Sequence, residues 1–241
     1  MSAEPAFRYA FAQSPCGGVA LALGGADVVL RASGALWIGA ERLLAVADLH
    51  LEKGSAYAAR GQLLPPYDTR ETLARLAAEA AQLRPRTIVL LGDSFHDRAG
   101  ESRLSEADVR ALTSLATLAE LVWVAGNHDA EGPTSLPGAI AAEWRAAGLR
   151  FVHEPAEGPA GGEVAGHLHP CAKIKARVGS VRRRCFVTDG ERLVMPAFGA
   201  FAGGLNARDA AFDKLFVRPP LAVALGERRA HAVGWGQLRG D

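Results

Sequence analysis

A repeated local pattern constrains this chain more than any other feature: short apolar runs that each end in glycine, aspartate, asparagine or histidine. The runs 43–47, 87–91 and 121–125 are rich in leucine, valine and isoleucine and are short enough to be buried strands. Polar groups follow five such runs, as Asp48-Leu49-His50, Gly92-Asp93, Gly126-Asn127-His128-Asp129, His153 and Gly166-His167-Leu168-His169. In open α/β sheets, ligands collect beyond the carboxyl ends of the strands. We therefore expect one rim of a sheet to gather these side chains.

Strand signals alternate with helix signals between these runs. The first fifty residues predict short strands separated by glycine turns, with Gly24-Gly25 as the plainest hairpin turn. Helices are predicted to begin at Asp68 and at Ser105, and a third covers about Gly138 to Ala147, with Gly148 as its C-terminal cap. Two hairpins follow, one turning at Asp189-Gly190 and one joining residues 219–225 to 230–235. The pattern predicts a single layered α/β domain over residues 1–241, with mixed central sheets flanked by helices.

Composition excludes several classes of protein. Hydrophobic residues make up 49% of the chain and charged residues 22%, which argues against disorder, and the net charge of +1 indicates no general attraction to nucleic acid. The three cysteines, Cys16, Cys171 and Cys185, show no paired spacing, which favours a reducing compartment. The first ten residues lack the basic-then-apolar order of a signal peptide, and no apolar run approaches the roughly 18 residues of a membrane span. We expect a cytoplasmic protein with no membrane association.

The donor types at the rim suit transition metals. Carboxylate oxygen, amide oxygen and imidazole nitrogen together favour Mn, Fe or Zn over Mg or Ca. In an extended segment, residues two apart point to the same side, so Asp48 and His50 would converge, as would His167 and His169. Seven such groups are too many for one tetrahedral site. They predict two divalent ions that share a carboxylate.

In their order along the chain, these motifs resemble the signature of calcineurin-like metallophosphoesterases. The resemblance implies a layered metallophosphoesterase fold and a metal-activated hydroxide that attacks a phosphoester. It implies the following ligands: Asp48, His50 and His169 for the first ion, Asn127, His153 and His167 for the second, and Asp93 bridging both. It also implies that His128 is the general acid that protonates the leaving oxygen, with Asp129 orienting it.

Two further stretches resemble narrower groups within that superfamily. The motif Asp93-Ser94-Phe95-His96-Asp97 is similar to one in double-strand-break repair nucleases, which implies that His96 contacts the substrate. The stretches Ala47 to Gly54 and Pro196 to Asn206 resemble bacterial metallophosphoesterases associated with an ATP-dependent DNA ligase and a helicase. This resemblance implies a manganese-dependent DNA endonuclease in DNA repair, with that ligase and helicase as partners.

A basic stretch after His169 points to DNA independently. Lys173, Lys175 and Arg177 alternate, so on a strand they would share one face and could follow a phosphate backbone. Arg182, Arg183 and Arg184 begin the next predicted strand, and no acidic residue interrupts residues 171–188. The gap between Asn127 and His153 is too short for a capping domain, which leaves an open cleft for a polymer. We expect DNA as the substrate, single-stranded in preference to duplex.

Other interpretations account for parts of the same pattern. The metal site also suits a phosphoesterase that acts on nucleotides or other small phosphate esters, because function lies in the cleft rather than in the fold. A catalytically silent scaffold is a third reading, against which the full ligand set and His128 count. His96 could brace the loop behind Asp93, the basic stretch could be a solvated strand face, and Glu52 and Lys53 read as a surface pair.

Overall fold

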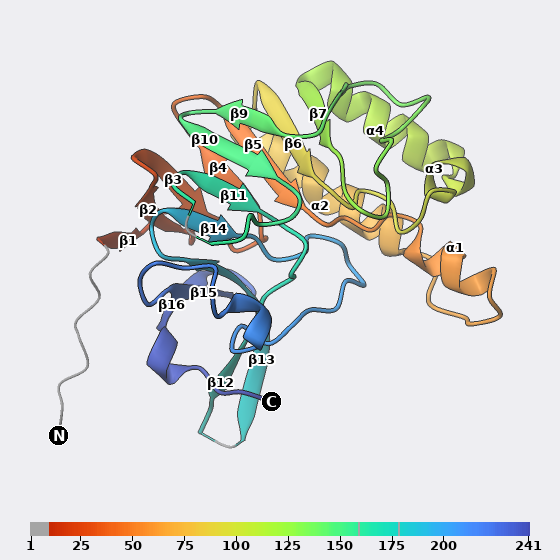
Figure 1. The fold of residues 1–241 in the computed structure, drawn as a ribbon. Coiled ribbons are helices and arrows are strands. Elements are labelled where there is room, and N and C mark those ends of the chain that lie inside the picture. Colours follow the sequence, from red (N-terminus) through yellow and green to blue (C-terminus); the bar gives the residue numbers. More distant parts are fainter. Residues whose placement is uncertain (1–9, 159, 178) are drawn as a thin grey trace, which may run out of the picture.

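The computed structural model describes residues 10–158, 160–177 and 179–241. Two β-sheets face each other, and helices cover the outer face of the first (Figure 1). The mixed α/β architecture predicted from the sequence is confirmed. Residues 1–9, which carry most of the stretch used to argue against a signal peptide, lie outside the described residues.

The first sheet follows the order of the sequence, from β1 to β8. Its strands are β1 (Phe11–Gln13), β2 (Val19–Leu23), β3 (Ala26–Leu30), β4 (Leu36–Ile38), β5 (Leu43–Ala47), β6 (Thr87–Leu91), β7 (Glu120–Val124) and β8 (Ala139–Ala141). Neighbours from β1 to β5 are antiparallel, whereas β5, β6, β7 and β8 run parallel. The carboxyl ends of β5, β6 and β7 therefore meet at one edge, where the polar motifs follow.

The second sheet has the order β16-β15-β13-β14-β11-β10-β9. Its strands are β9 (Trp144–Ala146), β10 (Leu149–Val152), β11 (Glu163–Ala165), β13 (Ser180–Thr188), β14 (Arg192–Val194), β15 (Leu221–Leu225) and β16 (Ala230–Gly234). β10 and β11 are parallel, so His153 and the His167 turn leave the sheet on the same side. β12 (Cys171–Lys175) pairs with β13, and the two form a hairpin that projects from the body (Figure 1).

The described helices are α1 (Lys53–Ala58), α2 (Asp68–Leu83), α3 (Gly100–Arg103) and α4 (Glu106–Leu118), with the 3₁₀ turns η1 (Ala210–Phe212) and η2 (Trp235–Gln237). As predicted, Ser105 caps α4, since its Oγ accepts the N–H of Asp108. Asp68 plays a different part, because its carboxylate accepts the N–H of Gly54 and thereby joins α2 to α1. Within these described segments, every helix is too short or too polar to cross a membrane.

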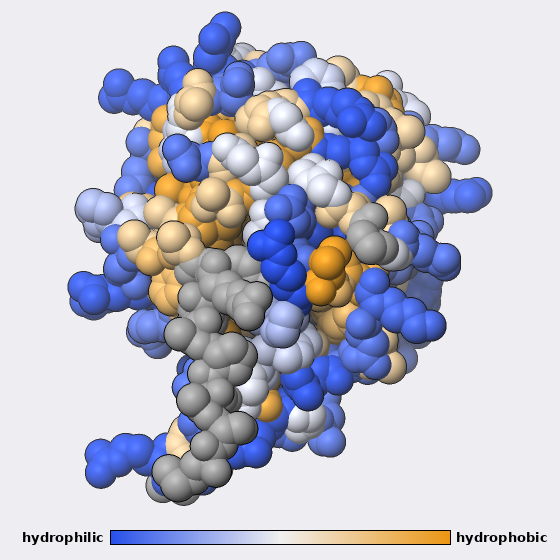
Figure 2. Space-filling view, turned by 60° about the vertical axis from the view of Figure 1, so that its left-hand side comes forward, coloured by the Kyte–Doolittle hydropathy of each residue, from blue (hydrophilic) through white to orange (hydrophobic). Residues whose placement is uncertain are grey.

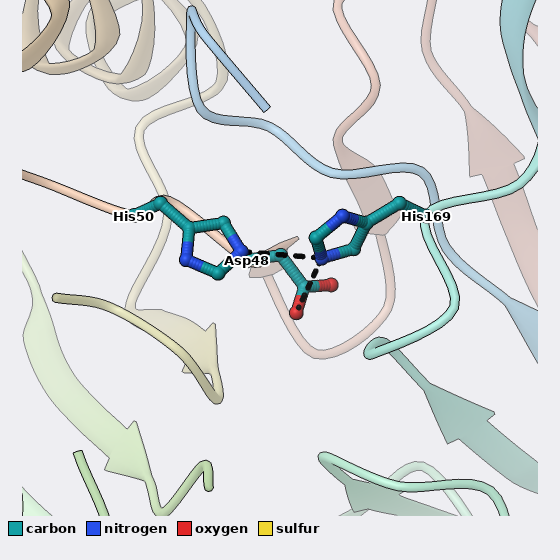
Figure 3. A group of neighbouring side chains, drawn as sticks. All are labelled: Asp48, His50 and His169. Carbon is teal, nitrogen blue, oxygen red and sulfur yellow. Dashed lines mark hydrogen bonds and ion pairs between the residues drawn. The ribbon is translucent and has the colours of Figure 1, made fainter. Parts of the chain in front are cut away.

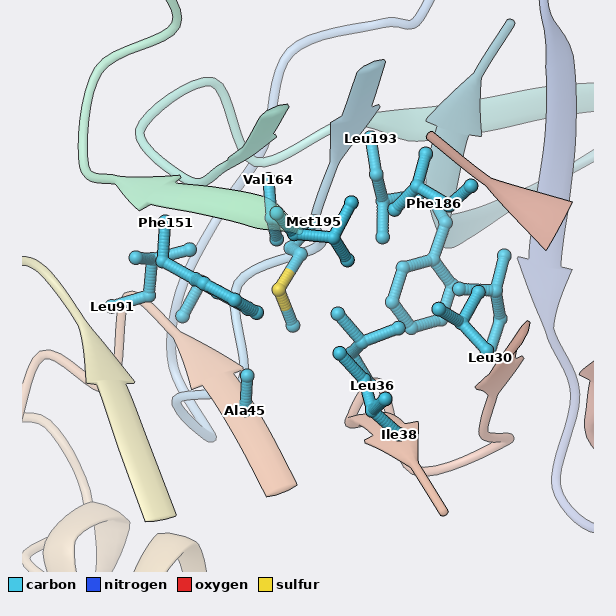
Figure 4. Close-up of a cluster of buried hydrophobic side chains, with 14 of the residues drawn as sticks. Leu30, Leu36, Ile38, Ala45, Leu91, Phe151, Val164, Phe186, Leu193 and Met195 are labelled. Carbon is cyan, nitrogen blue, oxygen red and sulfur yellow. The ribbon is translucent and has the colours of Figure 1, made fainter. Parts of the chain in front are cut away.

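The core is divided by the alternation of side chains along β5. Leu44 and Val46 face α2 and α4, whereas Ala45 and Ala47 face the second sheet. Figure 4 shows the inner layer, in which Leu36 and Leu91 from the first sheet meet residues of the second, including Phe151, Phe186 and Met195. Burying one leucine or phenylalanine contributes roughly 1.5–3 kcal/mol. This packing fixes the two sheets against each other and so fixes the strand ends that carry the polar motifs.

The predicted helix from Gly138 to Ala147 is wrong. The segment forms β8, which extends the first sheet beside β7, and β9, which pairs with β10. Ala147 and Gly148 have φ of 52° and 75° and form the two-residue turn between β9 and β10. A left-handed glycine occurs both at helix ends and in tight hairpins. Gly148 therefore correctly indicates left-handed backbone, but it belongs to a hairpin rather than to a helix end. Strand pairing outweighs the helix preference of the alanines.

The other predicted hairpins are confirmed. β13 and β14 pair across Asp189-Gly190, and β15 pairs with β16.

The side of the molecule near β1–β3 carries a groove of about 620 Å³ lined by residues such as Phe11, Val29 and Trp37. Figure 2 brings this side forward and shows apolar side chains among charged ones. β1–β3 lie at one end of the sheet order and β6 and β7 near the other, so this groove is separate from the rim with the polar motifs.

Candidate metal centre

Two similar turns carry four of the predicted ligands. Asp48 and His50 follow β5 with φ of 53° and 45°, and His167 and His169 follow β11 with φ of 68° and 46°. The expectation that these segments are extended is therefore wrong, although the side chains converge. Left-handed backbone at a residue other than glycine costs of order 1–3 kcal/mol and persists only when the surroundings enforce it. Asp and His are among the residues that tolerate it best.

Backbone hydrogen bonds hold the first turn. The N–H groups of Asp48, His50 and Leu51 donate to the carbonyls of Gly92, Asp93 and Ser94 at 3.2, 2.9 and 2.8 Å. The segment after β5 thus stays paired with the segment after β6, which brings Asp93 beside Asp48. On the other side, the N–H of Gly199 donates to the carbonyl of Asp48 at 3.1 Å.

A ligand side chain holds the second turn. The N–H of His167 donates to both carboxylate oxygens of Asp48, at 3.1 and 3.0 Å. The N–H of Gly166 donates to the carbonyl of His153 at 2.9 Å. A Cβ on Gly166 would lie 2.6 Å from Asp48 Oδ2, so only glycine allows this close approach.

Asp48, His50 and His169 form a first group of donor atoms that all lie within 4.8 Å of one another (Figure 3). His169 Nε2 lies 3.2 Å from Asp48 Oδ1 and 3.2 Å from His50 Nε2. In Figure 3 the two imidazoles point toward each other with the carboxylate below them. Two ring nitrogens and one carboxylate oxygen that converge in this way suit one transition-metal ion.

Asp48, Asp93 and His153 form a second group with the same closeness of donor atoms. His153 Nε2 lies 3.4 Å from Asp93 Oδ1, and His167 Nδ1 lies 3.2 Å from the same His153 nitrogen. Asn127 Oδ1 is in hydrogen-bonding contact with His153 Nε2. The structure thus brings all seven predicted ligands together. It places Asp48 in both groups, whereas the bridging role of Asp93 stays a prediction.

The buried charges of this centre fit two cations. Asp48 and Asp93 are 0% and 3% exposed, and the ion pairs of both carboxylates are with histidines rather than with lysine or arginine. The Nδ1 atoms of His50 and His153 are buried without a hydrogen-bond partner. Buried charges are normally paired or coordinate a metal. Burial first, and then the charge of His169, lowers the pKa of His50 to about 2, so its imidazole is neutral, as a metal ligand must be.

His128 and His96 lie side by side at the edge of the centre. The two rings are stacked with centroids 5.8 Å apart, and the His128 side chain is 45% exposed. His128 Nε2 lies 3.8 Å from Asp93 Oδ2, and its N–H donates to Asp93 Oδ1 at 3.0 Å. Burial, and next the charge of Lys53, lowers the pKa of His96. Both rings also lie beside the ring of the predicted ligand His50, with centroids 5.9 Å (His96) and 5.5 Å (His128) from it.

Asp129 connects two of the motifs through the backbone. One of its oxygens accepts the N–H groups of Ser94 and Phe95 at 2.7 and 3.1 Å, and the other accepts the N–H of Gly126 at 3.2 Å. Burial raises the pKa of Asp129, and the charge of Asp93 acts in the same direction. These contacts assign Asp129 to holding the Asp93 loop in place. Its predicted part in orienting His128 stays a prediction.

The segment Pro196 to Asn206, part of which the sequence suggests is a tight loop needed for packing, lies against the backbone of both turns. Gly199 packs on the backbone of the first turn, and a Cβ there would lie 2.1 Å from the carbonyl oxygen of Leu49. Gly204 does the same at the second turn, with 2.1 Å to the carbonyl oxygen of His169. Arg184 donates to the carbonyls of Ala197, Ala200 and Ala202 at 3.1, 3.0 and 2.9 Å. The segment is therefore a brace for both turns.

The prediction that Glu52 and Lys53 form a surface pair is wrong. It is 8% exposed with φ of 64°, and its carboxylate accepts hydrogen bonds from the hydroxyls of Ser55 and Thr69. Lys53 turns away from it and donates to the carbonyl of Phe201 at 3.1 Å. These two residues join the start of α1 to α2 and to the brace.

The predicted basic stripe is only partly free. Lys173 and Lys175 lie on one face of β12, and Arg177 follows the strand. Lys173 Nζ lies 3.5 Å from Asp241 Oδ1, and Arg182 donates to the same carboxylate. Lys175 and Arg177 are exposed, whereas Arg184 is turned inward to the brace. The exposed cations of this hairpin that the sequence singled out are thus Lys175 and Arg177, on and just beyond the strand that follows His169.

These features define a metal-dependent phosphoesterase, and comparison with known proteins agrees. The model of the calcineurin-like phosphoesterase family matches residues 41–192, more than half of the chain, which therefore belongs to this family. Its members use divalent metal ions.

Solved structures give a second comparison. The chain is similar to the nuclease MPE of Pseudomonas putida, with 28% identity and a TM-score of 0.70 over 89% of this chain and 100% of that one. It is less similar to the phosphoesterase Yfce of E. coli, with 16% identity and a TM-score of 0.39 over 80% and 98% of the chains, a likeness too weak to argue from. Curated protein sequences gave no match. The likeness to a nuclease agrees with the subfamily resemblance seen in the sequence.

Proposed function

We propose that this protein is a manganese-dependent DNA endonuclease that acts in DNA repair. The observation that carries the proposal is the pair of ligand groups sharing Asp48, with the exposed side chain of His128 beside Asp93. The likeness to a nuclease over 89% of the chain supports nucleic acid rather than a small ester as the substrate.

The residues of the two groups would hold two divalent ions, with manganese proposed over iron or zinc. Asp48, His50 and His169 would bind the first ion, and Asp48, Asp93 and His153 the second, with Asn127 and His167 completing the set. When bound, such ions acidify water and neutralise charge on a phosphodiester. The chain's own contribution is to keep both carboxylates buried beside the place of the substrate phosphate.

His128 is proposed as the group that gives a proton to the departing oxygen of the strand. Imidazole exchanges protons near neutral pH, and its half-exposed ring is free to reach a substrate. The contact of its backbone N–H with Asp93 fixes the position of the residue relative to the centre. His96, stacked on His128, would contact the phosphate next to it.

Lys173, Lys175 and Arg177 are proposed to follow the DNA backbone away from the centre. They lie on the hairpin that begins after His169, and the positions of Lys175 and Arg177 are exposed. Contacts of this kind neutralise phosphates without reading sequence, so binding should weaken steeply with salt.

The proposal is tested with metal-stripped protein and circular single-stranded DNA, with and without manganese. The wild-type should cut the circle only with manganese, and Asp93→Ala should not cut it. Asp27→Ala, which removes an exposed aspartate from β3, is the matched control and should cut normally. Intact DNA beside hydrolysis of a nitrophenyl phosphodiester would favour a small substrate. The absence of any bound transition metal after reconstitution would favour a silent scaffold.

A further inference from the structure

The rim of the metal centre continues outward as a row of aromatic rings. His128 stacks on His96 with centroids 5.8 Å apart and planes inclined by 18°. His96 also contacts the ring of Tyr57, with centroids 5.6 Å apart and an inclination of 43°. Tyr57 comes from α1, which begins directly after the first turn. Three rings therefore lead from the ligands to the start of the adjoining surface.

Positive charge accompanies this row. Lys53 Nζ lies 5.9 Å from the centroid of the Tyr57 ring, and the charges of Lys53 and Arg60 both act on His96. An acidic group, Asp97, also acts on His96, but its carboxylate is engaged by Arg103 at 2.8 Å. Aromatic rings interleaved with cations are what proteins use to hold single-stranded nucleic acid.

The Tyr57 ring is held on a fixed support. The N–H of Gly54 donates to Asp68 at 3.0 Å, which anchors α1 to α2. The N–H groups of Arg60 and Gln62 both donate to the carbonyl of Tyr57, at 3.0 and 2.9 Å, and close the end of α1. The ring is half-buried, so one part packs against its neighbours while another faces solvent. A ring placed in this way loses little freedom on contact with a ligand.

We propose that the ring of Tyr57 stacks on an unpaired base of the DNA strand, next to the phosphate that lies before His96 and His128. This inference rests on the proposed function and names the form of DNA that the site selects. In a duplex the faces of the bases are covered by their neighbours, whereas a single strand or a frayed end can present a base to the ring. Tyr57 is thereby the residue that favours single-stranded substrate.

A purely structural role makes a different prediction. If Tyr57 only props His96, its loss would slow the chemical step on every substrate. If it stacks on a base, its loss would weaken binding only of DNA that has bases. A pair of substrates that differ only in their bases therefore separates the two roles.

The test compares oligo(dT) with an oligomer of abasic sugar phosphates of the same length, each cut by the manganese-loaded full chain. Tyr57→Leu, which keeps apolar bulk without the ring, and Tyr57→Ala should raise KM for oligo(dT) by roughly five- to a hundredfold. Both variants should match the wild-type on the abasic oligomer. Tyr57→Phe should match the wild-type on both substrates, because the ring rather than the hydroxyl is required.

Tyr67→Ala is the matched control, since it removes an exposed tyrosine that contacts Phe201 rather than the histidines. It should leave the KM ratio of the two oligomers unchanged. An equal fall in kcat on both oligomers for Tyr57→Ala, or no effect at all, would overturn the stacking role. Failure of the wild-type to cut either oligomer would instead sink the proposed function, and this inference with it.

Discussion

The turn after β5 and the turn after β11 have similar backbone geometry, but different hydrogen bonds hold them in place. Each places two ligands, separated by one residue, in left-handed backbone. The first is buried, with Asp48 and His50 at 0% and 7% exposure, and the backbone of the neighbouring segment holds it. The second is more exposed, with 19% exposure at the His169 side chain, and the carboxylate of Asp48 holds it.

This difference establishes an order of dependence. The first turn keeps its shape through contacts that no ligand side chain provides. The second turn depends on a side chain of the first, since both oxygens of Asp48 accept the N–H of His167. Damage at Asp48 should therefore spread to the second turn, whereas damage at the second turn should stay local.

The largest effect is expected at Asp48. Asp48→Ala removes the oxygen shared by the two ligand groups and the acceptor for His167, so both ions and all hydrolysis should be lost. His169→Ala removes a ligand of the first group only and should cost one ion. Metal content per chain after manganese reconstitution measures both. If Asp48→Ala retains one ion while Asp93→Ala loses two, then Asp93 is the shared ligand.

Asp48→Asn refines the same test. Its amide oxygen can still accept the N–H of His167, so the second turn should keep its shape while metal content falls. Protection of the His167 amide from hydrogen exchange should be lower in Asp48→Ala than in Asp48→Asn. Equal protection in both variants would show that the second turn stands without Asp48.

The next largest loss of activity is expected for His128→Ala. His128 lies outside both turns and is not a predicted metal ligand, so its loss should affect the chemical step alone. Metal content should stay normal, while kcat on DNA should fall by about 10²–10⁴ if His128 is the general acid. The fall should be much smaller for a diester with a nitrophenolate leaving group, which needs no proton. Equal slowing on both substrates would contradict the acid role.

Smaller effects should follow from filling the close approach at each turn. Gly199→Ala sets a methyl 2.1 Å from the Leu49 carbonyl oxygen, and Gly166→Ala sets one 2.6 Å from Asp48 Oδ2. Overpacking of this kind costs about 1–3 kcal/mol of unfolding free energy. We expect Gly199→Ala to lose more stability and Gly166→Ala to lose more manganese affinity.

Urea unfolding and metal titration measure these two quantities. Gly203→Ala is the control, because nothing lies within 4 Å of its added methyl, and its stability should stay near the wild-type value. A greater loss of metal affinity in Gly199→Ala than in Gly166→Ala would reverse the comparison.

The smallest effect on stability is expected from a set of hydrogen bonds outside both turns. Glu101 accepts four hydrogen bonds from Thr134 and Ser135 and lines a cavity of about 270 Å³ together with Asp129. Burial acts to raise its pKa, but these bonds outweigh it and lower the pKa to about 2. A depressed pKa contributes stability that is present above the unfolded value of 4.5 and lost as pH falls through about 2.

Glu101→Gln should therefore be less stable than the wild-type at neutral pH, and the difference should shrink between about pH 4.5 and pH 2. Denaturant midpoints across that range measure it. Glu106→Gln, at an exposed position paired only with Arg110, should show almost no difference at any pH. If Glu101→Gln is less stable than the wild-type by the same amount at every pH, the charge of Glu101 is not the cause of the difference.

Much of the fold could be predicted, because the apolar runs and turn residues are local signals. The runs that became β5, β6 and β7 are buried on both faces, and the motifs at their ends follow from that. Asp48, His50, Asp93 and Asn127 converge for that reason, whereas His153, His167 and His169 follow two parallel strands of the second sheet. The failure at residues 138–147 came from a signal with two meanings, since Gly148 needs left-handed backbone in either context.

What could not be predicted depends on contacts between distant parts of the chain. Arg183 and Arg184 look identical in a basic run, yet only Arg184 meets the carbonyls of the brace. Those partners are backbone carbonyls of residues 197–202, which are all alanine, phenylalanine or glycine, so no polar side chain in that stretch indicates the contact. The left-handed backbone of the ligands could not be predicted, because aspartate and histidine also adopt extended backbone.

The brace also bears on how the protein is made. Every predicted ligand precedes Pro170, but the carbonyls of Ala47 and Asp48 accept the N–H groups of Phe198 and Gly199 at 2.8 and 3.1 Å. Contacts between residues so distant in sequence require a long loop to close before they can form. A nascent chain that has emerged only as far as β14 would carry the whole ligand set without the clamp on its first turn. The first turn of the metal-binding rim can thus be clamped only after Phe198 and Gly199 have followed the ligands out of the ribosome.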